Sequence, residues 1–277
     1  MKLKKLTRKK LGELKPYLDD LVGEVEKSSY IEHDPIRFMY DYSDKREKEI
    51  AGFLAATMAW GRRDIVISKT DDLLRRMEYK PLDFTLNYSQ SEFGALQGFK
   101  HRTFKPVDIH GILMALNNIY RHYPDFESFW IEAYNSSKLK NTHLIHEFRT
   151  RFMHLSPDMA SRTEKHISDP EKGSSCKRLW MYLRWCSRQN SPVDTGIWNF
   201  IPSSELMIPL DVHVARQSRR LGLLSRSYND RKAVEELTSV LKKLDPDDPS
   251  KYDYPLFGIG ALNLTLPDQF IINPKAE

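Results

Sequence analysis

The chain lacks several features that define common classes of protein. It contains only two cysteines in 277 residues, which excludes a disulfide-rich secreted framework. Cys176 and Cys186 are ten residues apart with an expected helix between them, which separates them by about 15 Å at a rise of 1.5 Å per residue, so they cannot bridge each other. No apolar run approaches the ~20 residues of a membrane span, and no secretory signal follows the basic N-terminus. We therefore expect a reduced, cytoplasmic protein without a membrane segment.

Patterns typical of metal and nucleotide chemistry are also missing. The histidines show no spacing that favours a zinc site, and the chain has no phosphate-binding glycine loop and no Ser-His-Asp order. Two cysteines cannot supply the four ligands of an iron–sulfur cluster. We expect no metal site and no cofactor, and no obligate protein partner is evident.

Helical periodicity is what the chain has in abundance, while strand-like alternation is scarce. Connections between the apolar stripes are short and carry proline or glycine. The pattern predicts an all-α protein, a single unit over residues 1–277. The expected helices cover residues 11–25, 50–57, 65–77, 112–120, 126–134, 144–152, 178–188, 234–244 and 254–262.

Basic charge is concentrated in one part of the sequence. The segment from Lys172 to Arg226 holds nine lysines or arginines and three acids, a net charge of +6, whereas the whole chain carries +5. The first fifteen residues add another +6, which we interpret mainly as a solvated N-terminal helix. The basic segment favours a polyanionic partner.

A glycine turn precedes a helix inside this basic segment. Gly173-Ser174-Ser175-Cys176-Lys177 follows a polar, proline-containing stretch, and the apolar spacing predicts a helix from Arg178. Lys177 therefore falls in the first turn of the helix. The N–H groups and partial positive charge of a helix start suit a phosphate and favour an uncharged amine.

A second helix start follows in the sequence Pro209-Leu210-Asp211-Val212-His213. Apolar residues at helical spacing after Asp211 predict that this aspartate is the N-cap. Taken alone, Lys177 is explained as a solvated lysine on a helix, and Asp211 is explained as a helix cap. Taken together, they pair an amine nucleophile with a carboxylate that can activate it.

These two motifs resemble the helix-hairpin-helix superfamily of DNA glycosylases. In that family a Gly-x-Gly-x-Lys hairpin precedes one helix and a Val-Asp-x-His sequence opens another; here Ser175 stands at the second glycine. The spacing from Lys177 to Asp211 is similar to that of the archaeal 8-oxoguanine glycosylase branch. Over its full length the chain also resembles an uncharacterised bacterial family without an assigned function.

The resemblance implies a fold and an activity. The expected fold is all-α and glycosylase-like, with two lobes and a cleft between them: residues 47–169 form the middle lobe, and residues 1–46 and 170–277 form the second, with the hairpin at 170–188. The expected activity is excision of a damaged base, first 8-oxoguanine, from double-stranded DNA, followed by strand cleavage as an AP lyase. Lys177 would form a Schiff base with the sugar, and Asp211 would stabilise the cationic sugar.

The resemblance also implies binding residues. Phosphates would contact the hairpin and the starts of both helices, and family hairpins bind a sodium or potassium ion through backbone oxygens. A flipped base would stack on aromatic residues or bond to a carboxylate. The implied DNA contacts are Gly173, Ser174, Ser175, Cys176, Arg178, His213 and Arg216. The implied base-pocket residues are Phe53, Trp60, Trp198 and Asp253.

Two other functions remain open from the sequence. The first is a nucleic-acid-binding protein without catalytic activity, which keeps the hairpin for phosphate contacts. The second is an enzyme that acts on structured RNA or on a free nucleoside with the same lysine and aspartate.

Overall fold

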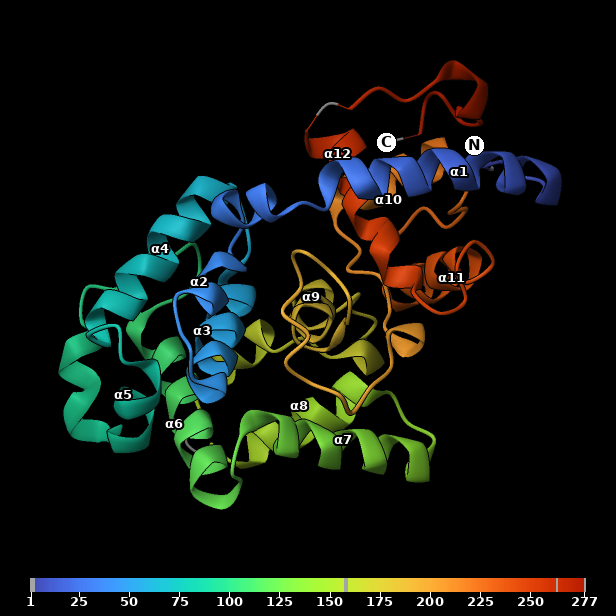
Figure 1. Cartoon of the computed structure of the whole chain (residues 1–277). Coiled ribbons are helices and arrows are strands. Elements are labelled where there is room, and N and C mark those ends of the chain that lie inside the picture. The colour runs from blue at the N-terminus through green and yellow to red at the C-terminus, as the bar shows by residue number, and fades with distance from the viewer. Residues whose placement is uncertain (1–2, 157–158, 263, 277) are drawn as a thin grey trace. The chain divides into compact units, whose positions relative to one another are not determined.

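The computed structural model describes residues 3–156, 159–262 and 264–276, and it confirms the all-α fold class (Figure 1). Every expected helix is present. No strand occurs in the described ranges, where β-type pairing is limited to two isolated bridges, His101 with Phe104 and Ser174 with Asp230. None of the described helices is both long and apolar enough to cross a membrane.

The chain divides into two compact units. Unit 1 combines Met1–Tyr30 with Lys172–Glu277, and unit 2 is Ile31–Glu171. The middle part therefore begins at residue 31 rather than at the expected residue 47. The reason is a short helix, α2 (Arg37–Tyr40), that packs on α3 (Lys45–Met58). A Cβ on Gly52 would lie only 2.7 Å from the Met39 sulfur, so the glycine allows this close packing.

Unit 2 is built around a cluster of aromatic side chains. Phe53 on α3 is completely buried and contacts the rings of Phe126, Phe148 and Phe152 at centroid distances of 5.1–6.1 Å. The buried carboxylate of Glu49 accepts the backbone N–H groups of Phe126 and Glu127 at the start of α7, so it acts as a helix cap from another helix. The helices of unit 2 after α3 are α4 (Arg63–Arg76), α5 (Pro81–Asn87), α6 (Pro106–His122), α7 (Phe126–Lys140) and α8 (Leu144–His154).

Unit 1 brings the two ends of the chain together around the C-terminal helices. α12 packs against both α1 and α10 (Figure 1). Near the ends, the Leu6 N–H donates to the Gly222 carbonyl, and the Asn273 side chain bonds to both backbone groups of Lys4. The helices of unit 1 are α1 (Arg8–Val25), α9 (Lys177–Ser187), α10 (Val212–Arg220), α11 (Arg231–Leu241) and α12 (Asp253–Ala261).

The long connection from α9 to α10, residues 190–208, folds back on α9. Thr195 and Trp198 donate backbone N–H groups to the carbonyls of Trp185 and Cys186, each at 2.8 Å. The Trp198 ring is completely buried and meets Tyr182 edge-on at 5.2 Å. The connection is therefore part of the core of unit 1.

Candidate active site

Lys177 is the first residue of α9, as the sequence predicts, and a strained turn places it there. Gly173 has φ +84° and Cys176 has φ +50°, both in the left-handed region that glycine favours. The Ser174 hydroxyl accepts the Cys176 N–H at 3.2 Å, and the Gly173 carbonyl accepts the Arg231 N–H at 3.1 Å. One hydrogen bond within the turn and one to the start of α11 thus hold its backbone, which fixes the position of the Lys177 Cα.

Asp211 is the N-cap of α10, and this prediction is also confirmed. Its Oδ1 accepts the Val214 N–H at 2.8 Å. Its Oδ2 lies 3.8 Å from the Lys177 Nζ, and the two side chains are 14% and 30% exposed. One oxygen of the carboxylate therefore holds the helix, while the other faces a lysine that a ligand can reach.

Asp253, at the start of α12, is the third member of this group. Burial raises its pKa to about 6; the Arg184 charge opposes that shift, the Asp211 carboxylate adds to it, and Lys177 opposes it. Arg184 Nη1 donates to Asp253 Oδ2. The structure thus brings Lys177 and Asp211 together and places Asp253 where the charges of both act on its carboxyl group.

The raised pKa of Asp253 predicts a pH-dependent stability difference. Because the folded protein favours the neutral acid, the wild type loses stability as the pH rises from about 4 to about 6, while Asp253→Asn does not ionise there. We expect the free energy of unfolding of Asp253→Asn, relative to wild type, to rise by on the order of 2 kcal/mol across this window. Urea unfolding at several pH values measures it. Parallel pH profiles for the two proteins would contradict the raised pKa.

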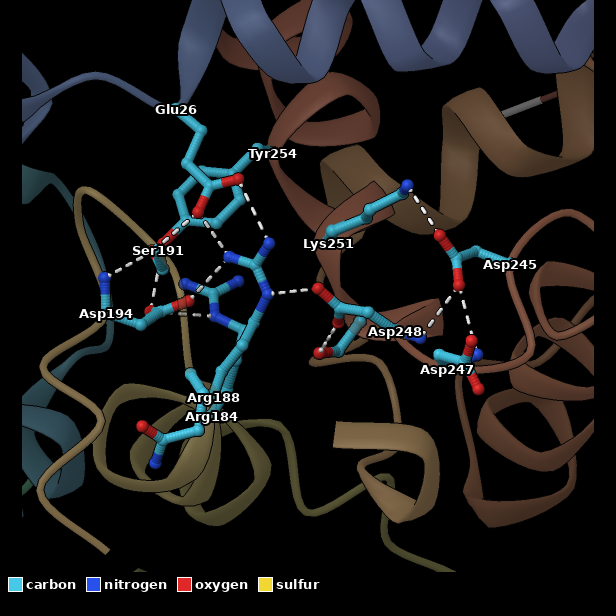
Figure 2. Close-up of polar contacts among 12 residues, drawn as sticks. Glu26, Arg184, Arg188, Ser191, Asp194, Asp245, Asp247, Asp248, Lys251 and Tyr254 are labelled. Atoms are coloured by element: carbon cyan, nitrogen blue, oxygen red, sulfur yellow. Dashed lines mark hydrogen bonds and ion pairs between the residues drawn. The ribbon is translucent and has the colours of Figure 1, made fainter. Parts of the chain in front are cut away.

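Behind the candidate site lies a buried network of charges that sequence reasoning missed (Figure 2). Arg184 in the last turn of α9 and Arg188, the C-cap of that helix, both bond to Asp194 in the following connection, at 3.3 and 3.0 Å. Arg188 also pairs with Glu26 at the end of α1 and with Asp248 before α12, the latter at 2.7 Å. These charges raise the pKa of Arg188 against the effect of its burial. The network joins three distant segments of unit 1.

Tyr254 completes the network. Its hydroxyl donates to Asp194 at 2.9 Å, and the Arg184 guanidinium lies 4.4 Å from the centre of its ring. One pattern in the sequence indicates such a network: two arginines four residues apart on an otherwise apolar helix face require buried carboxylates. The sequence does not show which carboxylates these are.

The remaining predicted DNA contacts fall into two groups. In the hairpin and the first turn of α9, Ser174, Ser175 and Arg178 are partly exposed, whereas Cys176 is buried. Partial burial lowers the pKa of Arg178 to about 10, so its guanidinium is still charged at neutral pH. His213 and Arg216 lie on α10. The carbonyl of Gly260 can only accept, so the His213 Nδ1, 3.2 Å away, carries the hydrogen.

Two of the predicted base-pocket aromatics are core residues instead. Phe53 and Trp198 are completely buried among other side chains, so neither ring face is available for stacking on a base. Trp60, in unit 2, is 45% exposed, and the Arg102 guanidinium lies 4.9 Å from its ring centre. Among the expected aromatic residues, only Trp60 offers an exposed ring.

No group of histidine, cysteine or carboxylate side chains in the described ranges is arranged to hold a metal ion. Both cysteines are buried, and neither forms a disulfide. The expected monovalent cation at the hairpin stays a prediction.

A family model described as "Protein of unknown function (DUF2400)" matches residues 34–262, which is most of the chain. The chain belongs to this family. No curated protein and no solved structure matches it.

Membership of the DUF2400 family corrects the resemblance to helix-hairpin-helix glycosylases. The matching model covers both the hairpin and Asp211, on which that resemblance depended, and it is the model of a family of unknown function. The physical reason is that a glycine turn before a helix and an aspartate N-cap determine only local backbone geometry, and unrelated folds use both.

Proposed function

We propose that this DUF2400 protein is a DNA glycosylase with associated AP lyase activity, acting on double-stranded DNA that contains a damaged base. The observation that carries the proposal is the 3.8 Å approach of the Lys177 amine to the Asp211 carboxylate, at the starts of two helices. Attack on a sugar carbon requires an uncharged amine, and an adjacent carboxylate can accept the proton of the ammonium group. The proposal rests on this geometry and not on membership of a glycosylase superfamily.

In the first step, Asp211 Oδ2 takes a proton from the Lys177 ammonium group. The free amine then forms a bond to the sugar C1′ while the bond between C1′ and the base breaks. The base leaves with the bonding electrons and receives the proton that Asp211 holds. The same carboxylate thus serves as a base and then as an acid.

In the second step, the sugar ring opens. The ring oxygen leaves C1′ with the bonding electrons and takes up one proton of the attached nitrogen, which leaves a protonated imine between Lys177 and C1′. Water then takes a proton from C2′, a double bond forms between C2′ and C3′, and the bond from C3′ to the phosphate oxygen breaks, so that the phosphate leaves and the strand is cut. Base removal and strand cleavage therefore share one covalent intermediate.

The charges of unit 1 support DNA as the substrate. Arg216 and Arg220 on α10 form no ion pair with any described residue, so their charges are available to phosphates. The damaged nucleotide has to leave the base stack before its C1′ atom can be attacked. The Lys177 side chain is 30% exposed, so a nucleotide outside the stack can reach the amine. A glycosylase-like two-lobed fold and 8-oxoguanine as the lesion stay predictions.

Borohydride trapping tests the proposal. The purified protein is incubated with duplexes that contain an abasic site, 8-oxoguanine, other damaged bases or no lesion, and the adduct is mapped by peptide mass spectrometry. We expect an adduct on the abasic duplex and on at least one damaged duplex, attached at Lys177. A matching RNA duplex serves as the control for substrate class.

One observation favours a second candidate function. The Asp211 carboxylate caps α10 and pairs with Lys177, and both contacts can be purely structural, without a catalytic role. If no duplex gives an adduct while salt-sensitive DNA binding persists, the protein is a nucleic-acid-binding protein without catalytic activity.

A further inference from the structure

A pocket of about 420 Å³ opens on unit 1 directly after Asp211. It lies between the first turns of α10 and the turn that leads to α11. The lining residues are Val212, His213, Arg216, Arg219, Ser227, Tyr228 and Asn229. Two of these residues, His213 and Arg216, were expected to contact DNA, but the proposed chemistry and the family match assign no role to the pocket or to Arg219 and Tyr228.

Arg219 brings a buried positive charge to this pocket. Its side chain is held by bonds from Nε to the Arg226 carbonyl at 2.8 Å and from Nη2 to the Asn229 side chain, and the residue is only 4% exposed. No carboxylate in the described part of the chain pairs with it. Burial lowers the pKa of Arg219, and the more distant Glu236 charge only partly opposes this. An anion in the pocket would supply the missing counter-charge.

Arg216 and Tyr228 form the accessible part of the pocket. Arg216 lies one turn before Arg219 on α10, so the two side chains share a helix face. Arg216 is exposed and makes no hydrogen bond or ion pair to the residues that the structure describes. Tyr228 is 71% exposed, so a ligand can reach its ring, and the Arg226 guanidinium lies 5.9 Å from the ring centre. The pocket thus combines the exposed ring of Tyr228, the exposed guanidinium of Arg216 and the buried guanidinium of Arg219.

We infer that this pocket binds a phosphate of the DNA strand that carries the damaged nucleotide. Arg216 and Arg219 contact the phosphate oxygens, and Tyr228 stacks on an adjacent base or sugar. The choice of a DNA strand rests on the proposed function, because the pocket begins at Val212, next to Asp211. Phosphate bound here would position the strand relative to Lys177.

The test measures binding to a short labelled duplex by fluorescence anisotropy over a range of salt concentrations. The duplex contains a tetrahydrofuran abasic analogue, which lacks the aldehyde and forms no Schiff base. The variants are Arg216→Ala and Tyr228→Ala, both at exposed positions. The matched control is Lys242→Ala, which removes one exposed positive charge outside the pocket.

We expect Arg216→Ala to weaken binding about tenfold and to reduce the slope of log Kd against log salt by about 1. Tyr228→Ala should weaken binding without changing this slope, because stacking releases no counterion. If Arg216→Ala behaves like Lys242→Ala in both respects, the inference is overturned. Competition by inorganic phosphate as strong as that by a phosphorylated dinucleotide would also overturn the assignment to a strand.

The binding test of the phosphate site and the trapping test of the proposed glycosylase activity can fail independently. If wild-type protein gives no trapped adduct but Arg216→Ala still loses affinity and slope, the glycosylase proposal fails and the phosphate site stands. If the adduct forms and Arg216→Ala binds like the control variant, the phosphate site alone fails.

Discussion

Lys177→Gln is expected to abolish the trapped adduct and to lower strand cleavage at an abasic site by at least about 10³-fold, because no amine remains to form the imine. Its effect on folding should be small. The pair with Asp211 is partly exposed and 3.8 Å long, so the free energy of unfolding should fall by less than about 1 kcal/mol. Single-turnover cleavage kinetics and urea unfolding measure the two effects.

Lys172→Gln is the matched control for this loss. Lys172 precedes the hairpin and is exposed, and the ion pair of Asp211 is with Lys177, so substitution of Lys172 removes the same charge without changing that pair. Cleavage by Lys172→Gln should stay close to that of wild type. Equal activity of Lys177→Gln and wild type would exclude Lys177 as the nucleophile.

Asp211→Asn distinguishes the structural role of the Asp211 carboxylate, which caps α10, from the role of its charge beside Lys177. Asparagine also accepts the Val214 N–H, so α10 keeps its start and stability should be little changed. Only the oxygen that faces Lys177 loses its charge. A large fall in cleavage at unchanged stability would assign this oxygen to the chemistry, whereas unchanged cleavage would leave Asp211 with the cap alone.

Arg188→Ala is expected to lower the free energy of unfolding by about 3–5 kcal/mol, because it leaves Glu26 and Asp194 buried without a full counter-charge. The Arg188 side chain is only 5% exposed, so water cannot replace the lost contacts. Urea unfolding at neutral pH measures the loss. Because Glu26 ends α1, we also expect faster backbone amide exchange near the end of this helix.

Lys15→Ala is the comparison for Arg188→Ala within unit 1. Lys15 pairs with Asp19 on the surface of α1, where the side chains are 42% and 31% exposed, so this loss should stay below about 1 kcal/mol. Similar losses for the two variants would show that the buried network contributes no more than an exposed ion pair.

The helices and both helix starts were predictable because their causes are local. Apolar spacing of 3.6 residues marks each helix, and an aspartate before such a pattern is a cap that needs no distant partner. Lys177 and Asp211 were therefore placed correctly, each at the start of its own helix. Their 3.8 Å approach was an expectation from resemblance, and the packing of unit 1 supports it geometrically.

The roles of the aromatic residues were not predictable in the same way. Helical spacing shows that Phe53 lies on an apolar stripe, but it does not show what covers that stripe. In the structure Phe126, Phe148 and Phe152 cover it. Trp198 lies in a connection without periodicity, and its burial depends on backbone hydrogen bonds to α9.

The sequence by itself determined the all-α class, the positions of the expected helices with boundaries up to about six residues from those observed, the basic segment and the Asp211 cap, because each depends on neighbours along the chain. Only the tertiary structure decided that the charges of Lys177 and Asp211 act on Asp253, that Asp194 joins Arg184 and Arg188, and that Arg219 lines a pocket. These contacts join segments that are far apart in sequence or that lack periodicity. Their energies come from burial and paired charges, which exist only after the helices have packed.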